Sequence, residues 1–470
     1  MGIVRVEQEL ARRARRHLGP DVAFCLYDRA QAAVVTIDDD LVENLLDGRI
    51  RIDFPQTRAA RGPEGSLRRK ARSVLLGNAT VYYLFQRARG RSLTRAQILQ
   101  IREQELAASK PKLQDGRGIA ARPGEIETVS LAALPHRYAR LDADTMIISG
   151  GLDWQYKDLR ALWDLKQAHR FAYCAVVYDL IAVHFPQFVV PGYVELLTDY
   201  FGELLWLADR TMCISHTTRS DWVRHASDVG VEPVPSSVFP LGCDLSPQGG
   251  DPIIDLPAVL NGKRFVLYVS TIEPRKNHFM LYQAWEECLR TKQIDPGRDR
   301  LVFVGRQGWA TEDLLHEIKT NPLTKETIII LHDLTDQQLT SLYRGCAFVL
   351  FPSLYEGFGL PLAEALGYGK PCLASNSGAL SEIGGDLVMR VDAKDTLEWS
   401  RAITRLMSGS SDLGAWEDRI KQHHRPITWD DAAKIFFETI AASIRNEVHS
   451  FGEQLGGPAE RPAPTRLWSR

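Results

Sequence analysis

The chain has 470 residues, of which 44% are hydrophobic and 25% are charged, so it is too long for one hydrophobic core and too apolar for a disordered protein. From this length we expect two or three domains. We also expect a soluble protein, because no apolar run reaches the roughly eighteen residues that a membrane-spanning helix needs. With 57 basic and 59 acidic residues, the net charge of −2 excludes nucleic-acid binding by overall charge.

The cysteine pattern indicates a reducing compartment. The seven cysteines are odd in number, widely spaced and mostly set in apolar runs, without a Cys-x-x-Cys pair. This is typical of buried thiols in a cytosolic protein and excludes a disulfide scaffold or a cysteine zinc site. The first residues, Met1 to Arg16, mix Glu with Arg, so no secretory signal is expected either.

A locally basic segment lies in the first part of the chain. Residues 51–123 hold sixteen Lys or Arg against five Asp or Glu, with apolar and aromatic residues between the charges. One interpretation is a solvated, loop-like insertion. Another is a surface for anionic lipid head groups, where each basic side chain adds about 1 kcal/mol. A nucleic-acid groove is the third, but the rest of the chain has no recognisable reader module.

From about residue 145, short apolar runs alternate with longer amphipathic segments. Strands are predicted at 145–149, 171–178 and 210–214, and helices at 157–169 and 193–208. Such alternation predicts a parallel sheet with crossover helices.

A second series of the same kind follows the Pro-, Gly- and Asp-rich stretch 247–257. Helical patterns follow its strands, for example at 279–290, 336–343 and 362–366. The predicted strands are 265–269, 301–304, 327–331, 347–351 and 371–374. The fold class is therefore α/β, with two doubly wound Rossmann-like domains that face a cleft.

The predicted domain boundaries follow from this pattern. Residues 1–245 are predicted to form the N-terminal domain with the basic insertion, and residues 246–428 the C-terminal domain. A helix at 429–450 can pack back on the first domain. Residues 451–470, with their Gly and Pro, are predicted to be a disordered tail.

Ligands of open α/β sheets bind beyond the carboxyl ends of the strands, so the residues that follow each predicted strand are the candidate site residues. After strand 265–269 comes Ser270-Thr-Ile-Glu-Pro-Arg-Lys-Asn277. Its adjacent cations, Arg275 and Lys276, suit an anionic ligand such as a diphosphate. A solvated surface pair is the alternative.

A glycine-rich turn with two carboxylates follows strand 347–351. In Glu356-Gly-Phe-Gly-Leu-Pro361, the glycines allow close approach to a ligand, and Pro361 suits the start of a helix whose free N–H groups face that ligand. Glu356 in the loop and Glu364 in the first helical turn can each accept two hydroxyl hydrogen bonds, as a sugar and a ribose require. For Glu364 alone, a charge that complements the helix dipole is the alternative.

These motifs resemble the retaining glycosyltransferases of family 4, which have the GT-B architecture. The resemblance is carried by the Glu-x7-Glu pair, the Gly-Phe-Gly-Leu-Pro inside it and the Glu-Pro-Arg-Lys-Asn turn, and it is strongest over 263–390. Four short motifs are similar to those of bacterial O-antigen and capsule mannosyltransferase-like enzymes: Gly150-Gly-Leu-Asp-Trp154, Val177-Tyr-Asp-Leu-Ile181, Ile214-Ser-His-Thr-Thr-Arg219 and Phe239-Pro-Leu-Gly-Cys-Asp244. Residues 1–140 resemble no family that we can name.

The resemblance implies donor-binding roles. Arg275 and Lys276 would neutralise the diphosphate of a nucleotide-sugar donor, Glu356 would hold the sugar hydroxyls and Glu364 the ribose hydroxyls. Many relatives have Gly-Arg where this chain has Ser270-Thr271, so Arg275 is expected to make both phosphate contacts.

The resemblance also places the base and the remaining donor contacts. The base would lie against His332-Asp-Leu-Thr335, including Leu334, with Gly305 and Arg306 nearby. The sugar and phosphates would face the backbone of Gly357, Phe358, Gly359 and Leu360.

The first-domain catalytic residue is left open. Many relatives have a His at the position of Tyr178. Asp179 is the first candidate for a base or for acceptor positioning, and His184 is the second. Gly150 and Gly151 are further acceptor-side candidates. An Asp that caps a turn and a His on a loop are the alternatives.

The implied reaction transfers a sugar with retention at the anomeric carbon, by a same-face substitution assisted by the departing phosphate. No metal or cofactor is predicted, and the UDP- or GDP-linked donor is a substrate. Asp142-Ala-Asp144 has the letters of a metal-binding Asp-x-Asp but precedes a strand, and two Asp in a turn, as in Asp38-Asp-Asp40, are common. The absence of Gly-x-Gly-x-x-Gly argues against a nicotinamide enzyme.

The main hypothesis is a cytoplasmic glycosyltransferase, peripheral at the inner face of the plasma membrane through residues 51–123, that builds a cell-surface polysaccharide on a glycan or lipid-linked glycan acceptor. A GT-B sugar-nucleotide epimerase is one alternative, and a non-catalytic sugar-nucleotide-binding protein is another.

Overall fold

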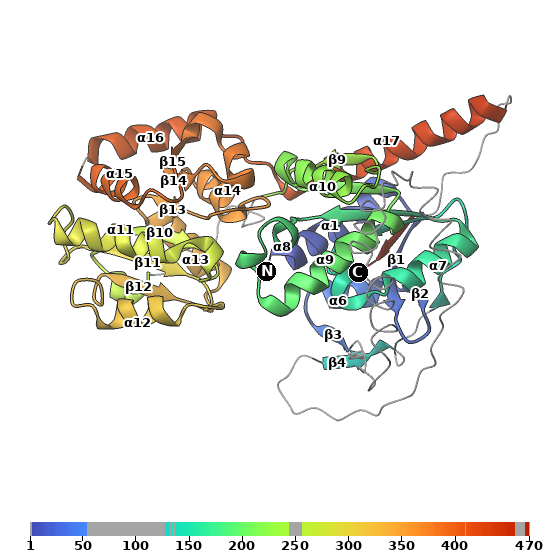
Figure 1. The fold of residues 1–470 in the computed structure, drawn as a ribbon, viewed down its shortest axis with the longest axis horizontal. Helices are drawn as coiled ribbons and strands as arrows, with labels where there is room; N and C mark the ends of the chain where they lie inside the picture. Colours follow the sequence, from blue (N-terminus) through green and yellow to red (C-terminus); the bar gives the residue numbers. More distant parts are fainter. Residues whose placement is uncertain are drawn as a thin grey trace.

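A computed structural model describes residues 2–53, 127–131, 134, 137–243, 256–408, 410–455 and 466–469. The chain forms two lobes, each built around a mostly parallel sheet (Figure 1). We call the part around the eight-stranded sheet the first lobe and the part around the six-stranded sheet the second lobe. This arrangement agrees with the predicted pair of doubly wound α/β domains.

The first-lobe sheet has the order β5-β2-β1-β16-β6-β7-β8-β9, and only the β1–β2 and β2–β5 pairs in it are antiparallel. The three predicted strands are confirmed as β6, β7 and β8. The strands of this sheet are β1 (Val22–Asp28), β2 (Ala33–Ile37), β5 (Arg137–Tyr138), β6 (Met146–Ser149), β7 (Ala172–Val177), β8 (Arg210–Cys213), β9 (Ser236–Val238) and β16 (Arg466–Ser469). A separate parallel pair joins β3 (Ile50–Asp53) to β4 (Glu127–Ser130).

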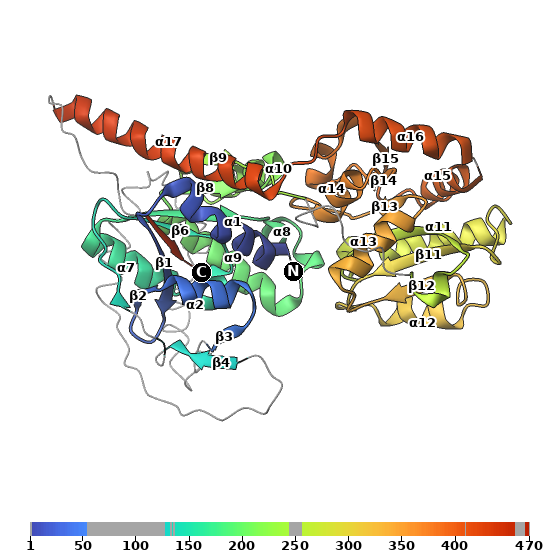
Figure 2. The same cartoon turned by 180° about the vertical axis from the view of Figure 1, so that it is seen from behind.

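Helices cover this sheet. They are α1 (Gly2–Leu18), α2 (Asp39–Leu46), α6 (Asp153–Tyr156), α7 (Leu159–His169), α8 (Ile181–His184), α9 (Pro191–Leu207), α10 (His216–Asp228) and α17 (Trp429–Leu455). From behind, α17 runs along the first lobe beside α1 (Figure 2). Trp429, Phe436 and Phe437 of α17 share an apolar cluster with Val6 and Leu10 of α1, so the end of the chain is part of the first-lobe core.

The C-terminal residues correct one prediction. Within the expected disordered tail, α17 continues to Leu455, and Arg466–Ser469 form β16. This strand pairs in parallel with β1 on one side and with β6 on the other. The pairing satisfies backbone groups of both neighbours. Composition alone does not show such a long-range contact. Residues 456–465 lie outside the described residues.

The second-lobe sheet is fully parallel, with the order β12-β11-β10-β13-β14-β15. All five predicted strands are confirmed, and β15 is additional. The strands are β10 (Arg264–Val269), β11 (Asp299–Val304), β12 (Ile328–Leu331), β13 (Val349–Phe351), β14 (Cys372–Ser375) and β15 (Val388–Val391). The helices are α11 (His278–Arg290), α12 (Glu312–Thr320), α13 (Asp336–Gly345), α14 (Leu360–Gly367), α15 (Thr396–Ser408) and α16 (Ser410–His423).

The order of these strands places a crevice. The chain runs outward through β10, β11 and β12 and then returns to β13 on the other side of β10. This reversal is a topological switch point, where ligands of open α/β sheets bind beyond the carboxyl ends of the strands. The loops after β10 and β13 carry the two main sequence motifs, so the topology brings those motifs together.

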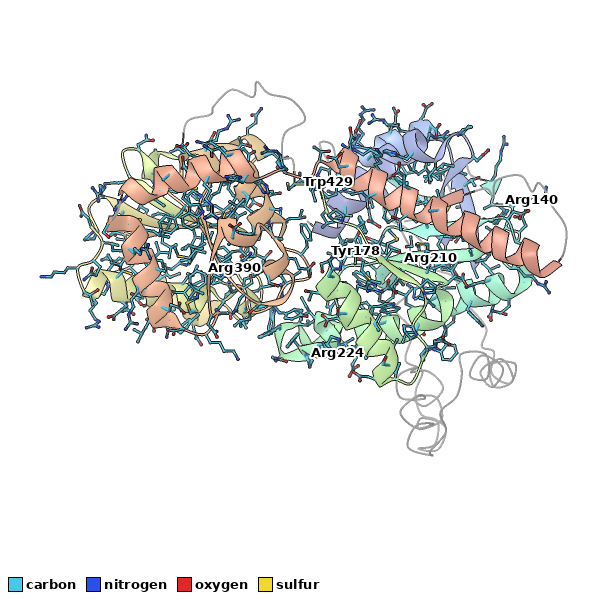
Figure 3. The ribbon with its side chains drawn as sticks, turned by 90° about the horizontal axis from the view of Figure 1, so that it is seen from above. Arg140, Tyr178, Arg210, Arg224, Arg390 and Trp429 are labelled. Atoms are coloured by element: carbon cyan, nitrogen blue, oxygen red, sulfur yellow. The ribbon has the colours of Figure 1, made fainter. Side chains whose placement is uncertain are left out.

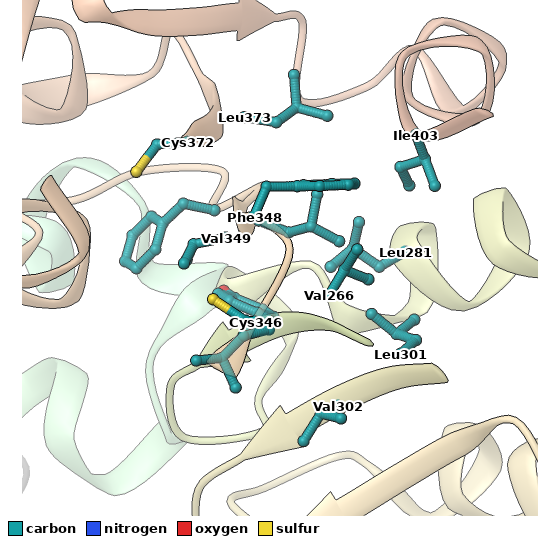
Figure 4. Packing of buried hydrophobic residues seen from close by; sticks show 14 of the residues in the cluster. Val266, Leu281, Leu301, Val302, Cys346, Phe348, Val349, Cys372, Leu373 and Ile403 are labelled. Carbon is teal, nitrogen blue, oxygen red and sulfur yellow. The ribbon is translucent and has the colours of Figure 1, made fainter. Parts of the chain in front are cut away.

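Apolar side chains of the helices pack against the second-lobe strands. Val266 and Leu301 of neighbouring strands pack with Leu281 of α11 and Ile403 of α15 (Figure 4). All seven cysteines lie within the described residues, are buried and form no disulfide with one another, as the sequence predicted: Cys25, Cys174, Cys213, Cys243, Cys288, Cys346 and Cys372.

Two predictions fall on residues that the structure does not describe. The basic segment 51–123 is described only at residues 51–53, and the domain boundary at 245 lies within the undescribed stretch 244–255. Both stay predictions. Within the described ranges, no helix combines the length and the apolar character needed to cross a bilayer.

Candidate active site

The turn after β10 is fixed by a proline and an asparagine. Pro274 begins a short 3-10 turn that ends at Lys276, and Asn277 follows it in the left-handed region with φ +62°. Asparagine tolerates this conformation better than most residues. Its side-chain amide donates to the carbonyl oxygens of Pro352, at 3.1 Å, and Ala393, at 2.7 Å. The turn is thereby tied to the loop after β13.

This tie brings two cations onto one carboxylate. Arg275 Nη1 lies 2.7 Å from Glu356 Oε2, and Lys276 Nζ lies 2.5 Å from Oε1. Arg275 also donates to Glu273 Oε1 at 2.9 Å and to the carbonyl of Tyr355 at 2.8 Å. The side chains of Arg275, Lys276 and Glu356 are only 16%, 14% and 8% exposed, so solvent screens these charges weakly. The resemblance assigns the main donor contacts to Arg275, Lys276, Glu356 and Glu364. The first three of these residues contact one another.

The pKa values follow from burial and charge. Burial raises the pKa of Glu356, but Arg275 and Lys276 outweigh it and bring that pKa down to about 2. Burial lowers the pKa of Lys276, and the positive charge of Arg275 lowers it further. Burial would also lower the pKa of Arg275, but Glu356 and Glu273 more than offset this and raise it. Glu356 is therefore a firmly ionised hydrogen-bond acceptor.

Gly357 brings this cluster against the first lobe. A Cβ at Gly357 would lie 2.4 Å from the carbonyl oxygen of Tyr178 and 2.8 Å from Cβ of Asp179, so only glycine allows the approach. The carbonyl of Gly357 accepts hydrogen bonds from Ser215 Oγ at 2.8 Å and from Thr218 Oγ1 at 3.2 Å. Two hydroxyls of the first lobe thus hold the loop that carries Glu356.

Asp179 lies at this junction. Its Oδ1 accepts the backbone N–H of Ile181 at 3.1 Å, so the carboxylate also caps a turn, as the alternative interpretation held. Burial raises the pKa of Asp179, while Arg275 opposes the rise. Asp179 is therefore electrostatically coupled to the Glu356 cluster, and its proposed role stays a prediction.

Tyr178 contacts the loop that contains Gly150 and Gly151. Its hydroxyl donates to the carbonyl of Gly150, and a Cβ at Gly151 would lie 2.7 Å from its ring atom Cε2. Figure 3 shows Tyr178 on the side of the first lobe that faces the second. Tyr178 therefore contacts both glycines of the Gly150–Gly151 loop. His184 Nε2 lies 3.4 Å from the carbonyl oxygen of Asp221 in α10, so its ring faces that helix.

Glu364 has partners of its own. It lies in the second turn of α14, not in the first as predicted, and it is 5% exposed. Its Oε1 accepts from Arg5 Nη1 at 2.9 Å and its Oε2 from the hydroxyl of Tyr343 at 3.2 Å. Arg5 belongs to α1 of the first lobe, 359 positions away, and no motif in the sequence signalled this pair.

The other predicted donor residues lie at the same sheet edge. Ser270 and Thr271 follow β10, Gly305 follows β11, and a Cβ at Gly305 would lie 2.0 Å from the carbonyl oxygen of Ser270. Arg306 Nε lies 3.2 Å from Oδ1 of Asp333, in the segment expected to face the base. Leu334, in that segment, packs against the core of the second lobe.

The loop between β13 and α14 serves the lobe junction as well. Phe358 packs against apolar clusters of both lobes, and Leu360 packs against the first-lobe cluster. Gly359 has φ +120°, and a Cβ there would lie 2.6 Å from Leu380. The predicted backbone contacts of these residues with a sugar stay predictions.

Further contacts between the lobes escaped the sequence motifs. Glu382 accepts the backbone N–H groups of His216, at 2.9 Å, and Thr217, at 2.7 Å, at the start of α10. A carboxylate is favourable at a helix N-terminus. A cavity of about 770 Å³ lies beside this contact, with Phe358 and His424 among its lining residues.

In the two Asp-rich motifs, 38–40 and 142–144, Asp side chains make local hydrogen bonds. Asp142 accepts the hydroxyl of Thr145 at 2.8 Å and the N–H of Asp144 at 3.2 Å. Asp38 caps α2 by accepting the N–H of Leu41 at 2.8 Å. In the part of the chain that the structure covers, no group of three His, Cys, Asp or Glu is placed to hold a metal ion.

Comparison with known proteins places this site in a family domain. Residues 257–423 match the family model described as Glycosyl transferases group 1, so this segment is a glycosyl transferases group 1 domain.

Curated relatives match parts of the chain. The serotype-specific mannosyltransferase WbdA of Escherichia coli is 32% identical over 216 residues, which are 43% of this chain and 25% of that protein. The O-antigen chain mannosyltransferase B of Escherichia coli is 35% identical over 132 residues, which are 28% of this chain and 33% of that protein. The matches thus span about a quarter to a third of the length of these relatives.

A solved structure shares the fold. The α,α-trehalose 6-phosphate synthase of Burkholderia multivorans superposes with a TM-score of 0.51 at 16% identity, over 68% of this chain and 74% of that one. The predicted GT-B fold class is therefore confirmed.

Proposed function

We propose that this chain is a glycosyltransferase that moves a sugar from a nucleotide diphosphate sugar to an acceptor hydroxyl with retention of anomeric configuration. The observation that carries the proposal is the Arg275–Lys276–Glu356 cluster at the switch point of a group 1 domain. The names of the matched relatives support a place in bacterial cell-surface polysaccharide synthesis, on a glycan or lipid-linked glycan.

The two cations act on the leaving group. Arg275 and Lys276 lie at the crevice with much of their charge balanced by Glu356, and the bound diphosphate would complete that balance. As the bond to the sugar breaks, negative charge grows on the diphosphate oxygen, and preorganised cations stabilise such charge without having to reorganise. Arg275 and Lys276 thereby stabilise the leaving diphosphate, and the proposal includes no metal or cofactor for that task.

Glu356 acts on the sugar. With a pKa of about 2, the carboxylate is ionised at neutral pH and accepts hydrogen bonds from the donor-sugar hydroxyls. Because Arg275 and Lys276 hold both of its oxygens, its orientation is set before the donor arrives. Asp179, across the junction, orients the acceptor hydroxyl.

The step balances without an outside reagent. The bond between the anomeric carbon and the diphosphate oxygen breaks, and its electron pair leaves with the nucleoside diphosphate. The acceptor oxygen bonds to the same face of the anomeric carbon, and its proton passes to the departing phosphate oxygen. The products are the glycosylated acceptor and a free nucleoside diphosphate.

A panel of UDP- and GDP-sugars, GDP-mannose included, tests the proposal through release of free nucleotide. We expect Glu356→Ala and Lys276→Ala each to abolish release, because each removes a donor contact and breaks the buried ion pair between Lys276 and Glu356. Glu287→Ala is the matched control, because Glu287 pairs with Arg290 on an exposed face of α11.

Undiminished turnover in both site variants would overturn the assignment. Conversion of the donor without acceptor and without free nucleotide would identify an epimerase instead. Donor binding without turnover on any acceptor would identify a binding protein.

A further inference from the structure

Arg5 of the first lobe reaches a carboxylate of the second. Its Nη1 donates to Glu364 Oε1 at 2.9 Å, with 29% of the Arg5 side chain exposed against 6% for Glu364. Its guanidinium carbon also lies 5.6 Å from the ring centroid of Trp429, at the start of α17. Trp429 appears at the junction of the lobes in Figure 3. Arg5 therefore lies where α1, α14 and α17 meet.

We propose that Arg5 is a positioning residue of the donor site, which orients the Glu364 carboxylate for the ribose diol of a nucleotide donor. This inference rests on the proposed function, in which Glu364 binds the ribose. A carboxylate offers about four acceptor positions on its two oxygens. Arg5 takes one position on Oε1 and Tyr343 takes one on Oε2, so each oxygen keeps one for a hydroxyl. Two neighbouring ribose hydroxyls supply two such donors.

The charges around Glu364 explain why a cation is needed there. Burial raises the pKa of Glu364, Arg5 and Tyr343 oppose the rise, and Asp336 of α13 adds to it. Tyr368, which follows α14, also interacts with Glu364, and burial raises its pKa further above neutral pH, so it carries no charge there. Without Arg5 the pKa of Glu364 rises further, and the carboxyl holds its proton up to a higher pH. A protonated carboxyl loses acceptor capacity toward the ribose.

The contact between Arg5 and Glu364 joins two lobes. Arg5 lies outside the group 1 domain at 257–423, whereas Glu364 lies inside it. Tyr343 of the second lobe holds Oε2 of Glu364 in any arrangement, whereas Arg5 can hold Oε1 only while the two lobes meet at α1. Affinity for the nucleotide therefore depends on the arrangement of the lobes, although the nucleotide site itself belongs to the second lobe.

Calorimetry with UDP and GDP on the full chain, between pH 5.5 and 8, tests the inference. We expect Arg5→Ala to weaken nucleotide binding roughly ten-fold or more, the usual effect of losing a hydrogen bond to a charged group. The loss should grow as pH falls, because Glu364 then takes up its proton, and Arg5→Lys should restore part of the affinity. Arg12→Ala is the control: Arg12 lies on the same helix and pairs with exposed Asp47 within the first lobe.

A double variant separates positioning from general structure. If Arg5 acts through Glu364, adding Arg5→Ala to Glu364→Gln should weaken binding no further than Glu364→Gln alone. Should Arg5→Ala not fold, Arg5→Gln keeps most of the aliphatic part of the side chain and a hydrogen-bond donor without the charge, and it should show the same pH dependence.

Three results would count against the inference. Binding by Arg5→Ala that matches Arg12→Ala at every pH, or effects of Arg5→Ala and Glu364→Gln that simply add, would overturn it and leave the proposed function intact. Absence of UDP and GDP binding in the wild-type chain would overturn the proposed function and this inference together.

Discussion

Two buried titratable groups beside the strand ends of the second lobe have depressed pKa values for different reasons. Glu356 owes its pKa of about 2 to Arg275 and Lys276, which outweigh the opposite effect of burial. His278 is 1% exposed, and burial lowers its pKa to about 3, with Lys276 acting in the same direction. Both groups bind fewer protons in the folded state than in the unfolded chain, so both make stability rise with pH.

The pH dependence of stability tests the state of His278. The unfolded chain takes up this proton below about pH 6.5, whereas the folded protein resists it down to about pH 3. Across this window the wild type should lose about 1.4 kcal/mol of unfolding free energy per pH unit through His278. His278→Gln should lack that loss, and exposed His332→Gln should keep it. Urea unfolding at pH 7, 5.5 and 4.5 measures the difference. Equal slopes for His278→Gln and wild type would contradict the interpretation.

At the scale of elements, the loop between β13 and α14 has two functions. Its start carries Glu356 into the crevice, while Phe358 and Leu360 fasten the same loop to the first lobe. Gly357 lies between Glu356 and Phe358, and its lack of a side chain lets the loop approach Tyr178 and Asp179 closely. Packing of the lobes and geometry of the site are therefore coupled through one short segment.

Two glycines in this region form a matched test. Gly357→Ala should cost about 1–3 kcal/mol of stability, because its Cβ meets backbone that cannot move freely, and it should reduce nucleotide release by shifting Glu356 from Asp179. Gly367→Ala, at the end of α14 with nothing within 4 Å of its Cβ, should be neutral or stabilise by up to about 1 kcal/mol. Thermal unfolding and nucleotide release measure both. Similar behaviour of the two variants would refute the close approach at Gly357.

At the scale of the whole molecule, the first and the last described segments, α1 and β16, both belong to the first lobe. Its last described residues, β16, fill the centre of the eight-stranded sheet between β1 and β6. Through α17, the end of the chain also packs on α1, which supplies Arg5 to the second lobe. The C-terminal segment is therefore a structural part of the lobe that completes the proposed donor site.

A proline in β16 tests this placement. Leu467 is paired with Ala23 on one side and with Ile147 on the other. Leu467→Pro removes a backbone N–H from the ladder and should cost about 1–3 kcal/mol, the penalty of an unsatisfied buried group. Leu467→Val keeps the N–H and should cost less. Equal thermal unfolding of both variants and wild type would return residues 466–469 to the tail first predicted for them.

Local pattern was enough for the parts of the fold that local physics controls. Strands β6 to β8, β10, β11, β13 and β14 are largely buried, and β12 at the edge of its sheet is partly buried. All of them read as apolar runs, so the sequence predicted these strands and their parallel pairing. The turn at Arg275–Lys276 and the loop at Glu356 lie beyond such runs. Their meeting followed from the rule that carboxyl ends of parallel strands share one edge.

What only the tertiary structure decided is which distant groups touch. Arg5 on Glu364, Gly357 on Asp179, Glu382 on α10 and β16 between β1 and β6 each join segments that are far apart along the chain. A charge or a short strand has no preferred distant partner in its own sequence. The partner is chosen when the lobes pack and buried backbone and charge must be satisfied. The sequence by itself therefore determined strands β6 to β8 and β10 to β14 and the residues that follow them, and packing of the lobes determined how those residues are held.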